Sequence, residues 1–182
     1  MRFFLRVISG KARRTTLVSP TGLNTRPTAD RAKEGLFNIL SEEISGAKFL
    51  DIFCGSGAIG IEALSRGASE VIFADNAAPA IKAVKENLQK TKLTAEILEM
   101  TAEKAIELLT AQNRKFDIIF LDPPYGSEIL TQTIKKLPPL LSENGKIIAE
   151  TETEISIEGL QLTEIRAYGR TKFLFYKTGA AK

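Results

Sequence analysis

Residues 51–60 read DIFCGSGAIG, which is the end of a buried strand, a glycine loop and the start of a helix. The glycines at positions 55, 57 and 60 let the backbone turn sharply and approach a ligand closely, because they carry no Cβ. An acid, Asp51, stands just before the loop. The stretch predicts a ligand-binding loop at the end of a strand, and the alternative is a tight turn without a ligand.

A second acid, Asp75, lies 20 residues beyond Gly55 at the end of the next expected strand. A carboxylate there accepts hydrogen bonds from a ribose diol, and the glycine spacing satisfies the dinucleotide pattern G-x-G-x-x-G. Together they indicate a nucleoside-type ligand but do not identify it. Asp51 argues against a pyrophosphate at the helix N-terminus and suits a positively charged ligand, such as the amino group or sulfonium of S-adenosylmethionine.

Strand patterns alternate with helix patterns from residue 48 onward. We expect strands at residues 49–53, 70–74, 95–98, 118–121 and 146–150, and helices at residues 59–66, 77–91, 102–111 and 129–140. Two further runs, residues 160–168 and 171–177, predict a C-terminal hairpin. Because the first five strands are almost continuously apolar, the pattern predicts an α/β fold with a mostly parallel seven-stranded sheet and one antiparallel strand.

The first part of the chain is strongly basic. Residues 1–33 hold eight Lys and Arg side chains against one acid, Asp30, whereas the rest of the chain is mildly acidic. Runs at residues 2–9 and 14–19 predict a β-hairpin with a basic tip, and a helix follows to about residue 43, with Thr28 as its expected cap. The asymmetry favours a polyanion partner over a basic face that is merely solvated. The candidate contacts to that polyanion are Lys11, Arg13, Arg14, Arg26 and Arg31.

A short strand that ends at two prolines carries the expected chemistry. Consecutive prolines cannot donate to a sheet, so the strand must stop at Asp122. Since proline has no N–H, the loop offers the Asp122 carboxylate and the Pro123 carbonyl as acceptors beside the aromatic ring of Tyr125. That combination suits a planar group with an NH2, such as the exocyclic amine of a nucleobase. Taken alone, the prolines also fit a tight turn before a helix.

The composition excludes several kinds of chemistry. The chain has one cysteine, Cys54, and no histidine, which rules out an intrachain disulfide, a thiolate metal cluster and histidine-dependent hydrolysis. We therefore expect no metal and a cofactor that brings its own reactive group. No apolar run reaches the roughly 20 residues that span a membrane. Arg6 interrupts any signal-peptide core, so we expect a cytoplasmic protein.

Two sets of motifs resemble known enzymes. Residues 51–60 with Asp75 and residues 122–125 resemble the class I S-adenosylmethionine-dependent methyltransferases, which are Rossmann-like, and their Asp-Pro-Pro-Tyr type methylates exocyclic amines of nucleic-acid bases. Residues 6–13 and 26–37 resemble the RsmD family of 16S (small-subunit) ribosomal RNA guanine-N2 methyltransferases. The likeness covers nearly the whole chain. It implies S-adenosylmethionine as cofactor, S-adenosylhomocysteine as product, and ribosomal RNA or the assembling small subunit as partner. We also expect a monomer.

The resemblance also implies a domain plan and roles for individual residues. Residues 1–24 would be a basic extension of a single catalytic domain, residues 25–182. The implied catalytic residues are Asp122, Pro123, Pro124 and Tyr125, of which the first two would accept the N–H bonds of guanine N2. The implied cofactor-binding residues are Asp51, Phe53, Gly55, Ser56, Gly57, Asp75, Asn76, Thr101 and Ala102. The family usually has an Asp-Ala pair near the adenine, and this chain has Thr101 and Ala102 there.

Three alternatives remain at this point. An adenine- or cytosine-amine methyltransferase of DNA would use the same acceptor loop, but such enzymes usually carry an added recognition domain. An NAD-dependent oxidoreductase would explain the glycine loop and Asp75 and would leave residues 122–125 without a role. A non-catalytic RNA-binding scaffold would retain the basic segment and the fold alone.

Overall fold

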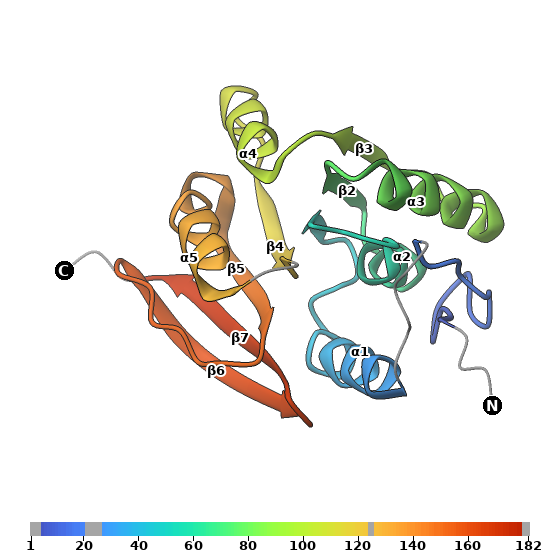
Figure 1. Cartoon of the computed structure of the whole chain (residues 1–182), viewed down its shortest axis with the longest axis horizontal. Helices are drawn as coiled ribbons and strands as arrows, with labels where there is room; N and C mark the ends of the chain where they lie inside the picture. Colours follow the sequence, from blue (N-terminus) through green and yellow to red (C-terminus); the bar gives the residue numbers. More distant parts are fainter. Residues whose placement is uncertain (1–4, 21–26, 124–125, 180–182) are drawn as a thin grey trace.

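The computed structural model describes residues 5–20, 27–123 and 126–179 (Figure 1). Its helices are α1 (Pro27–Ile39), α2 (Ala58–Ser65), α3 (Ala78–Thr91), α4 (Ala102–Ala111), α5 (Gly126–Lys135) and the 3-10 turn η1 (Pro138–Leu140). Its strands are β1 (Lys48–Ile52), β2 (Glu70–Asp75), β3 (Glu96–Glu99), β4 (Phe116–Leu121), β5 (Leu141–Thr151), β6 (Leu160–Tyr168) and β7 (Thr171–Thr178). The expected alternation of strands and helices is confirmed.

All seven strands form one sheet, in the order β3-β2-β1-β4-β5-β7-β6. Strands β1 to β5 are parallel to one another, and β7 runs antiparallel to both β5 and β6. The predicted Rossmann-like sheet with one antiparallel strand is confirmed. The strand order reverses between β1 and β4, because the chain builds outward to β3 and then crosses back. In such sheets ligands bind beyond the carboxyl ends of the strands at this reversal.

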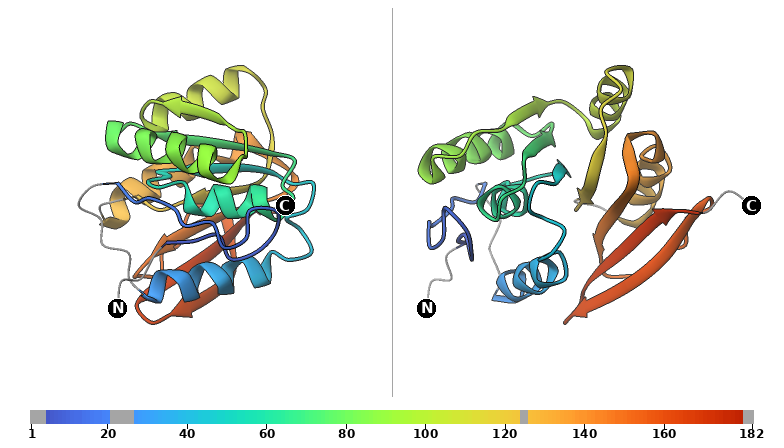
Figure 2. Two further views of the ribbon diagram at one scale, coloured as in Figure 1. Left: turned by 90° about the vertical axis from the view of Figure 1, so that its right-hand side faces the viewer. Right: turned by 180° about the vertical axis from the view of Figure 1, so that it is seen from behind.

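Two apolar cores cover the two faces of the sheet. Side chains alternate along each strand, so Phe49 and Phe73 face one core while their neighbours Leu50 and Ile72 face the other. Helices α1, α2 and α3 pack on the first core, and α4 and α5 on the second. The left view of Figure 2 looks onto the layer of α1, α2 and α3. Burial on both faces explains why the parallel strands read as continuous apolar runs.

The N-terminal segment, residues 5–20, lies beside α2 and α3 (Figures 1 and 2). The chain reverses on itself there, but only one antiparallel bridge forms, between Arg6 and Thr16. The predicted hairpin is confirmed in outline, since the N–H groups of Val7, Arg14 and Leu17 donate across it to the carbonyls of Thr15, Val7 and Leu5. The N–H groups of Ile8, Ser9, Ala12 and Val18 donate instead to side chains of the body, so the hairpin does not extend into a regular strand pair. Val7 and Leu17 are buried in the first core. The division of the chain near residue 24 stays a prediction.

Several element ends differ from the expected ones. Helix α1 begins at Pro27, so Thr28 lies inside its first turn and is not its cap, and the helix ends at Ile39. The N-cap of α3 is Ala77 and not Asn76. The Asp75 carboxylate accepts a hydrogen bond from the Ala77 N–H at 2.9 Å, so the last residue of β2 satisfies the start of the helix.

Candidate active site

The loop after β1 makes the first wall of the site. Phe53, Gly55 and Gly57 all have left-handed backbone angles, with φ of 59°, 54° and 73°. A left-handed Phe53 is costly, because its Cβ crowds the backbone, and such strain clusters at functional sites. The buried Asp51 carboxylate holds the other end of the loop by accepting the Gly60 N–H at 2.9 Å. The loop is therefore fixed in a sharply turned conformation.

Gly60 and Gly55 have different structural roles in this loop. A Cβ on Gly60 would lie 2.3 Å from a ring carbon of Phe73, so this position needs glycine for packing between α2 and the sheet. A Cβ on Gly55 would meet nothing within 4 Å. Gly55 therefore faces open space, which would let a ligand approach its backbone.

Asp75 fixes the same loop from the neighbouring strand. Its Oδ2 accepts the Gly55 N–H at 3.0 Å while its Oδ1 accepts the Ala77 N–H. The Asp75 side chain is half-buried, and Asn76 beside it is exposed. Each carboxylate oxygen has a second lone-pair direction, so Asp75 can still accept hydrogen bonds from a diol.

A cavity of about 610 Å³ opens between the glycine loop, the end of β4 and the tip of the β6–β7 hairpin. Its lining includes Asp51, Phe53, Cys54, Gly55 and Ser56 from the first wall, Asp122 from the end of β4, and Glu150, Glu152, Arg170 and Phe173 from the C-terminal strands. Ser19 and Pro20 of the N-terminal segment and Lys33 of α1 complete it. The cavity lies at the strand-order reversal, where the fold predicts a ligand.

Three acids in this cavity share an electrostatic environment. Burial raises the pKa of Asp51 well above its usual range, and the nearby carboxylates of Asp122 and Asp75 raise it further. Asp122 is open to the cavity, but protein atoms surround it on its other sides, and this desolvation raises its pKa to about 6. Burial and the charge of Asp122 raise the pKa of Glu150 to about 8. A positively charged ligand in this cavity would relieve the repulsion between these acids.

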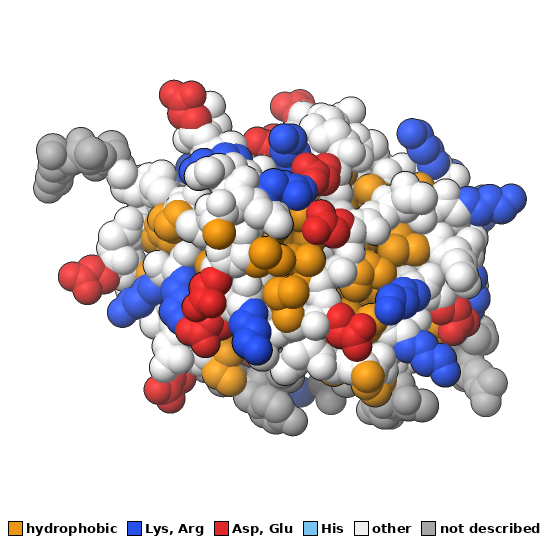
Figure 3. Space-filling model, turned by 90° about the horizontal axis from the view of Figure 1, so that it is seen from above, with side chains coloured by type: hydrophobic (Ala, Val, Ile, Leu, Met, Phe, Trp, Pro, Cys, Tyr) orange, Lys and Arg blue, Asp and Glu red, His pale blue; other side chains and the backbone are white. Residues whose placement is uncertain are grey.

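A second cavity, of about 220 Å³, lies on the other side of Phe53. Thr101, Ala102 and Ile106 of the α4 region line it, together with Ile129 of α5. The Thr101 hydroxyl caps α4 by accepting the Lys104 N–H at 3.4 Å. Figure 3 looks onto the face where α4 and α5 lie, and apolar side chains gather at its centre with charged ones around them.

The two cavities separate the predicted site residues into groups. Asp51, Phe53, Gly55, Ser56 and Asp122 line the larger one, and Phe53, Thr101 and Ala102 line the smaller one. Gly57, Asp75 and Asn76 line neither, although Asp75 holds the loop. Pro123 is half-buried at the end of β4. Pro124, Tyr125 and Arg26 lie outside the described residues.

The sequence reasoning missed the wall contributed by β5 and the C-terminal hairpin. Glu150 gave a usable signal, because it is an acid at the end of a predicted strand, like Asp75 and Asp122. Arg170 and Phe173 gave none, since their place in the cavity depends on β7 pairing with β5.

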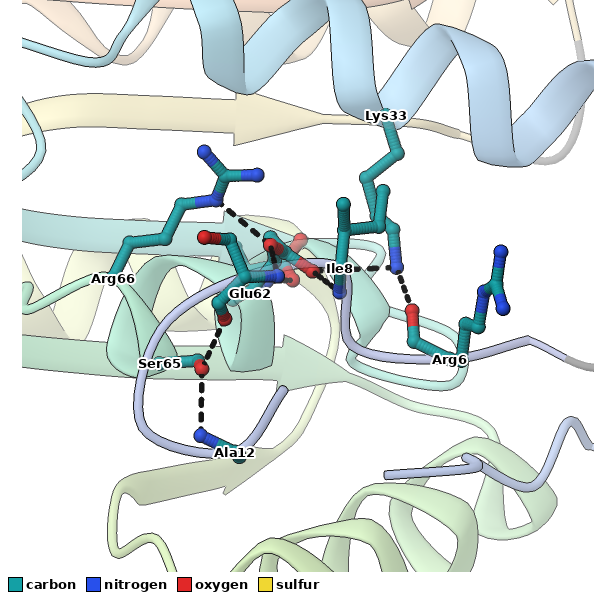
Figure 4. Close-up of polar contacts among 10 residues, drawn as sticks. Arg6, Ile8, Ala12, Lys33, Glu62, Ser65 and Arg66 are labelled. Atoms are coloured by element: carbon teal, nitrogen blue, oxygen red, sulfur yellow. Dashed lines mark hydrogen bonds and ion pairs between the residues drawn. The ribbon is translucent and has the colours of Figure 1, made fainter. Parts of the chain in front are cut away.

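The N-terminal segment is held through one buried acid, Glu62 of α2 (Figure 4). The Glu62 carboxylate accepts the N–H groups of Ile8 at 2.8 Å and Ser9 at 3.0 Å. It also accepts the Arg66 Nε–H at 2.7 Å. The Lys33 ammonium lies 3.6 Å from the same carboxylate, so two cations balance its charge. A buried charge with this many partners fixes the segment firmly.

Further contacts continue this anchoring. The Lys33 ammonium donates to the Arg6 carbonyl at 2.6 Å, and burial lowers the pKa of Lys33. The Ser65 hydroxyl accepts the Ala12 N–H at 2.9 Å and donates to the Ser9 carbonyl (Figure 4 shows the first contact). The segment is therefore joined to α1 and α2 along most of its described length.

Asn87 of α3 joins this segment to the glycine loop. Its side-chain Oδ1 accepts the Val18 N–H at 2.7 Å, and its Nδ2 donates to the Val18 carbonyl and to the Ser56 carbonyl, each at 2.9 Å. Asn87 is fully buried, so these three hydrogen bonds satisfy its amide.

The basic candidates of the first part of the chain face outward. Lys11, Arg13, Arg14 and Arg31 are exposed, and none has a carboxylate partner among the described residues. Arg14 adopts a left-handed backbone with φ of 70° in the turn that follows Gly10. Their charges are therefore available to a partner.

The family is decided by comparison with known proteins. A family model described as conserved hypothetical protein 95 matches residues 5–177. The chain is 35% identical to the ribosomal RNA small subunit methyltransferase D of Haemophilus influenzae, over 95% of this chain and 93% of that protein. The same protein of Escherichia coli is 34% identical over 82% of this chain and 76% of its own length. The chain belongs to this family. The expectation of an RsmD family member is confirmed.

Solved structures agree with membership of the RsmD family. The Escherichia coli protein yhhF superposes with a TM-score of 0.84 at 28% identity, over 98% of this chain and all 100% of that one. HI0767 of Haemophilus influenzae superposes with a TM-score of 0.76 at 32% identity, over 97% and 99% of the two chains. No described helix of this RsmD family member is long and apolar enough to cross a membrane.

The residues at and around the two cavities fit S-adenosylmethionine. Buried Asp51 presents a carboxylate to the cavity beside an open Gly55 backbone, which suits a ligand with a cationic amino group. Half-buried Asp75 suits a ribose diol. The neighbouring cavity at Phe53 and Ala102 suits an apolar ring.

Proposed function

We propose that this chain transfers a methyl group from S-adenosylmethionine to the exocyclic N2 amine of a guanine in small-subunit ribosomal RNA. The observation that carries the proposal is that the Asp122 carboxylate and the Asp51–Gly55 wall share one cavity. Membership of a family whose relatives are named ribosomal RNA small subunit methyltransferase D supports the reaction type and the substrate class. We also propose that the protein acts as a monomer in the cytoplasm and needs no metal.

Asp51, Asp75 and the backbone of Gly55 would hold the cofactor, with Phe53, Ser56, Thr101 and Ala102 beside it. When bound, S-adenosylmethionine supplies an electrophilic methyl group on a sulfonium. The chain's own task is to orient the amine in line with that methyl and to exclude water from the cavity. The apolar Phe120 and Phe173 at the cavity wall support water exclusion.

Asp122 would act on the amine directly. Guanine N2 is a weak nucleophile, because its lone pair is delocalised into the ring. If the Asp122 carboxylate and the Pro123 carbonyl each accept a hydrogen bond from one of the two N2–H groups, the N2 lone pair would point toward the methyl carbon. Asp122 would take the N2 proton that the amine must lose when it receives the methyl group, so that the product amine is neutral. Asp122 must be ionised for this, so its raised pKa of about 6 sets the acid limit of the reaction.

The exposed cations of the N-terminal segment would bind RNA phosphates. Lys11, Arg13 and Arg14 lie in one turn that is anchored to the body through Glu62 and Ser65. Arg31 on α1 and Arg26 complete the proposed contacts. Phosphate contacts fix the position of the RNA, while the cavity would select the base.

The test is to incubate the protein with ribosomal RNA, small subunits and duplex DNA in the presence of methyl-labelled S-adenosylmethionine, and to identify the modified nucleoside by mass spectrometry. N2-methylguanosine in the ribosomal RNA or subunit sample is the expected product. Methylated adenine or cytosine in DNA would overturn the proposal in favour of a DNA enzyme. Absence of any labelled nucleoside, with RNA still bound, would favour the scaffold alternative.

A further inference from the structure

Asp122 and Glu150 come together through the register of two parallel strands. In the β4–β5 pair Leu121 lies opposite Ala149. One residue further along each chain, Asp122 therefore lies beside Glu150, and neighbouring strands are about 4.8 Å apart. Both residues line the larger cavity. The fold thus places two carboxyl groups next to each other where the target base would enter.

The same register sets the direction of the two side chains. Phe120 and Ile148 are a register pair, and both face the core under α1 to α3. Asp122 and Glu150 are two residues further on, so they share that side of the sheet. Asp122 is exposed and Glu150 is half-buried, and both line the cavity.

No described cation neutralises Glu150. The charged groups that line the cavity with it are Asp51, Asp122, Glu152, Lys33 and Arg170. Lys33 is occupied by the Arg6 carbonyl and Glu62. Arg170 lies 4.0 Å from Glu152, and both of these side chains are largely exposed. Among the described residues, no group of three acids is placed to hold a metal ion.

The environment of the cavity favours the protonated form of both carboxyl groups, and more so for Glu150 than for Asp122. Burial, and then the charge of Asp122, raise the pKa of Glu150 to about 8, while the pKa of Asp122 is raised to about 6. Adjacent carboxyl groups share a proton because both cannot ionise cheaply at once. A neutral Glu150 has an O–H donor, whereas Asp122 remains an acceptor.

We propose that Glu150 is a recognition residue for the target base. Its carboxyl O–H donates a hydrogen bond to an unprotonated ring nitrogen, which lies next to the amine whose N–H donates to Asp122. The inference rests on the proposed function. In guanine that ring nitrogen is N3, the neighbour of N2 on the side away from N1–H. Two ionised carboxylates would instead accept from N1–H and N2–H. The acid and carboxylate pair therefore selects the N3 side of the amine.

The test compares Glu150→Gln and Glu150→Ala with the wild-type protein in methyl transfer to subunits. Gln keeps a neutral N–H donor, so Glu150→Gln is expected to retain activity within about 3-fold near pH 7. Glu150→Ala leaves the ring nitrogen unpaired and is expected to lose about 10-fold or more in kcat/KM, because an unmade hydrogen bond in a closed site is costly. Wild-type activity should fall as pH rises through about 8 and Glu150 ionises, and this fall should be absent in Glu150→Gln.

Controls separate this inference from the proposed function. Glu154→Gln changes an exposed acid that pairs with Lys172 outside the cavity, and it should leave the pH profile unchanged. S-adenosylhomocysteine affinity and thermal unfolding of each variant report whether the fold survives. Equal loss in Glu150→Gln and Glu150→Ala, or full activity in Glu150→Ala, would overturn the role of Glu150 while leaving the proposed function intact. Failure of the wild-type protein to methylate any RNA would overturn the proposed function itself.

Discussion

Asp122 lies in the cavity at a position where its charge is both costly and useful. It is open to the cavity, yet protein atoms around it raise its pKa to about 6, and Asp51 and Glu150 add two more carboxyl groups nearby. A developing positive charge on an amine is stabilised by such an unneutralised group. The proline-rich context predicted Asp122 from the sequence. It could not predict Glu150 as its neighbour, because that depends on which strand pairs with β4.

The first prediction concerns this residue. Asp122→Asn keeps the shape of the side chain and removes its ability to take a proton, so turnover should fall about 10²- to 10⁴-fold. S-adenosylhomocysteine affinity should change little, since Asp122 faces the base side of the cavity in our proposal. Isothermal titration and methyl transfer measure the two effects. Asp117→Asn, the same change at the opposite end of β4, should keep turnover. Unreduced turnover in Asp122→Asn would contradict the assigned role.

A second prediction follows from the pKa of the same residue. The folded-state pKa of Asp122 lies above the ordinary value for an aspartate, so its active, ionised form is lost as pH falls through about 6. Methyl transfer measured from about pH 5 to 7 should therefore show an acid limb near 6, well above the limb near 4 that an unperturbed Asp would give. An acid limb near 4 would show that the cavity does not desolvate Asp122 as the geometry implies.

The N-terminal segment shows the limits of prediction for whole elements. Val7 and Leu17 of this segment are buried in the first core, which the sequence analysis did not predict. The predicted hairpin keeps only a short pairing, because the N–H groups of Ile8, Ser9 and Ala12 donate to the buried Glu62 carboxylate and the Ser65 hydroxyl and not across the hairpin. The central strands were easier to predict. They are buried on both faces, so their sequences are continuous apolar runs without polar side chains that could compete for the backbone N–H groups.

Gly10 gives a third prediction, for this element. A Cβ there would lie 1.8 Å from the Ser65 carbonyl oxygen, and Gly10 has a φ of +82°. Gly10→Ala should therefore lower the free energy of unfolding. The matched control is Gly159→Ala, which has the same φ of +82° and nothing within 4 Å of the new Cβ. The difference between the two variants in urea unfolding should be about 1 to 3 kcal/mol, the usual cost of overpacking. Equal destabilisation of the two variants would mean that the N-terminal segment shifts to accommodate the new Cβ without a cost in free energy of unfolding.

The whole molecule combines a basic N-terminal part with a mildly acidic body, and this asymmetry gives the fourth prediction. Arg13 and Arg14 are exposed in one anchored turn, so replacing both with Ala should weaken RNA binding and reduce the slope of log affinity against log salt by about 1 to 2. The control replaces Lys104 and Lys177, two exposed lysines of the body, with Ala. An equal slope for both double variants would mean that RNA does not contact the turn.

The side-chain amide of Asn87 forms hydrogen bonds both to Val18 of the N-terminal segment and to Ser56 of the glycine loop. Neither partner can leave without stranding a buried polar group, so local opening of one should release the other. In native-state hydrogen exchange, the Val18 amide and the Gly57 amide, which is bonded across the loop to Cys54, should then exchange with one common free energy. Truncation of Asn87 to Ala should split that shared value in two. The N-terminal segment and the glycine loop would thus open locally as one cooperative unit.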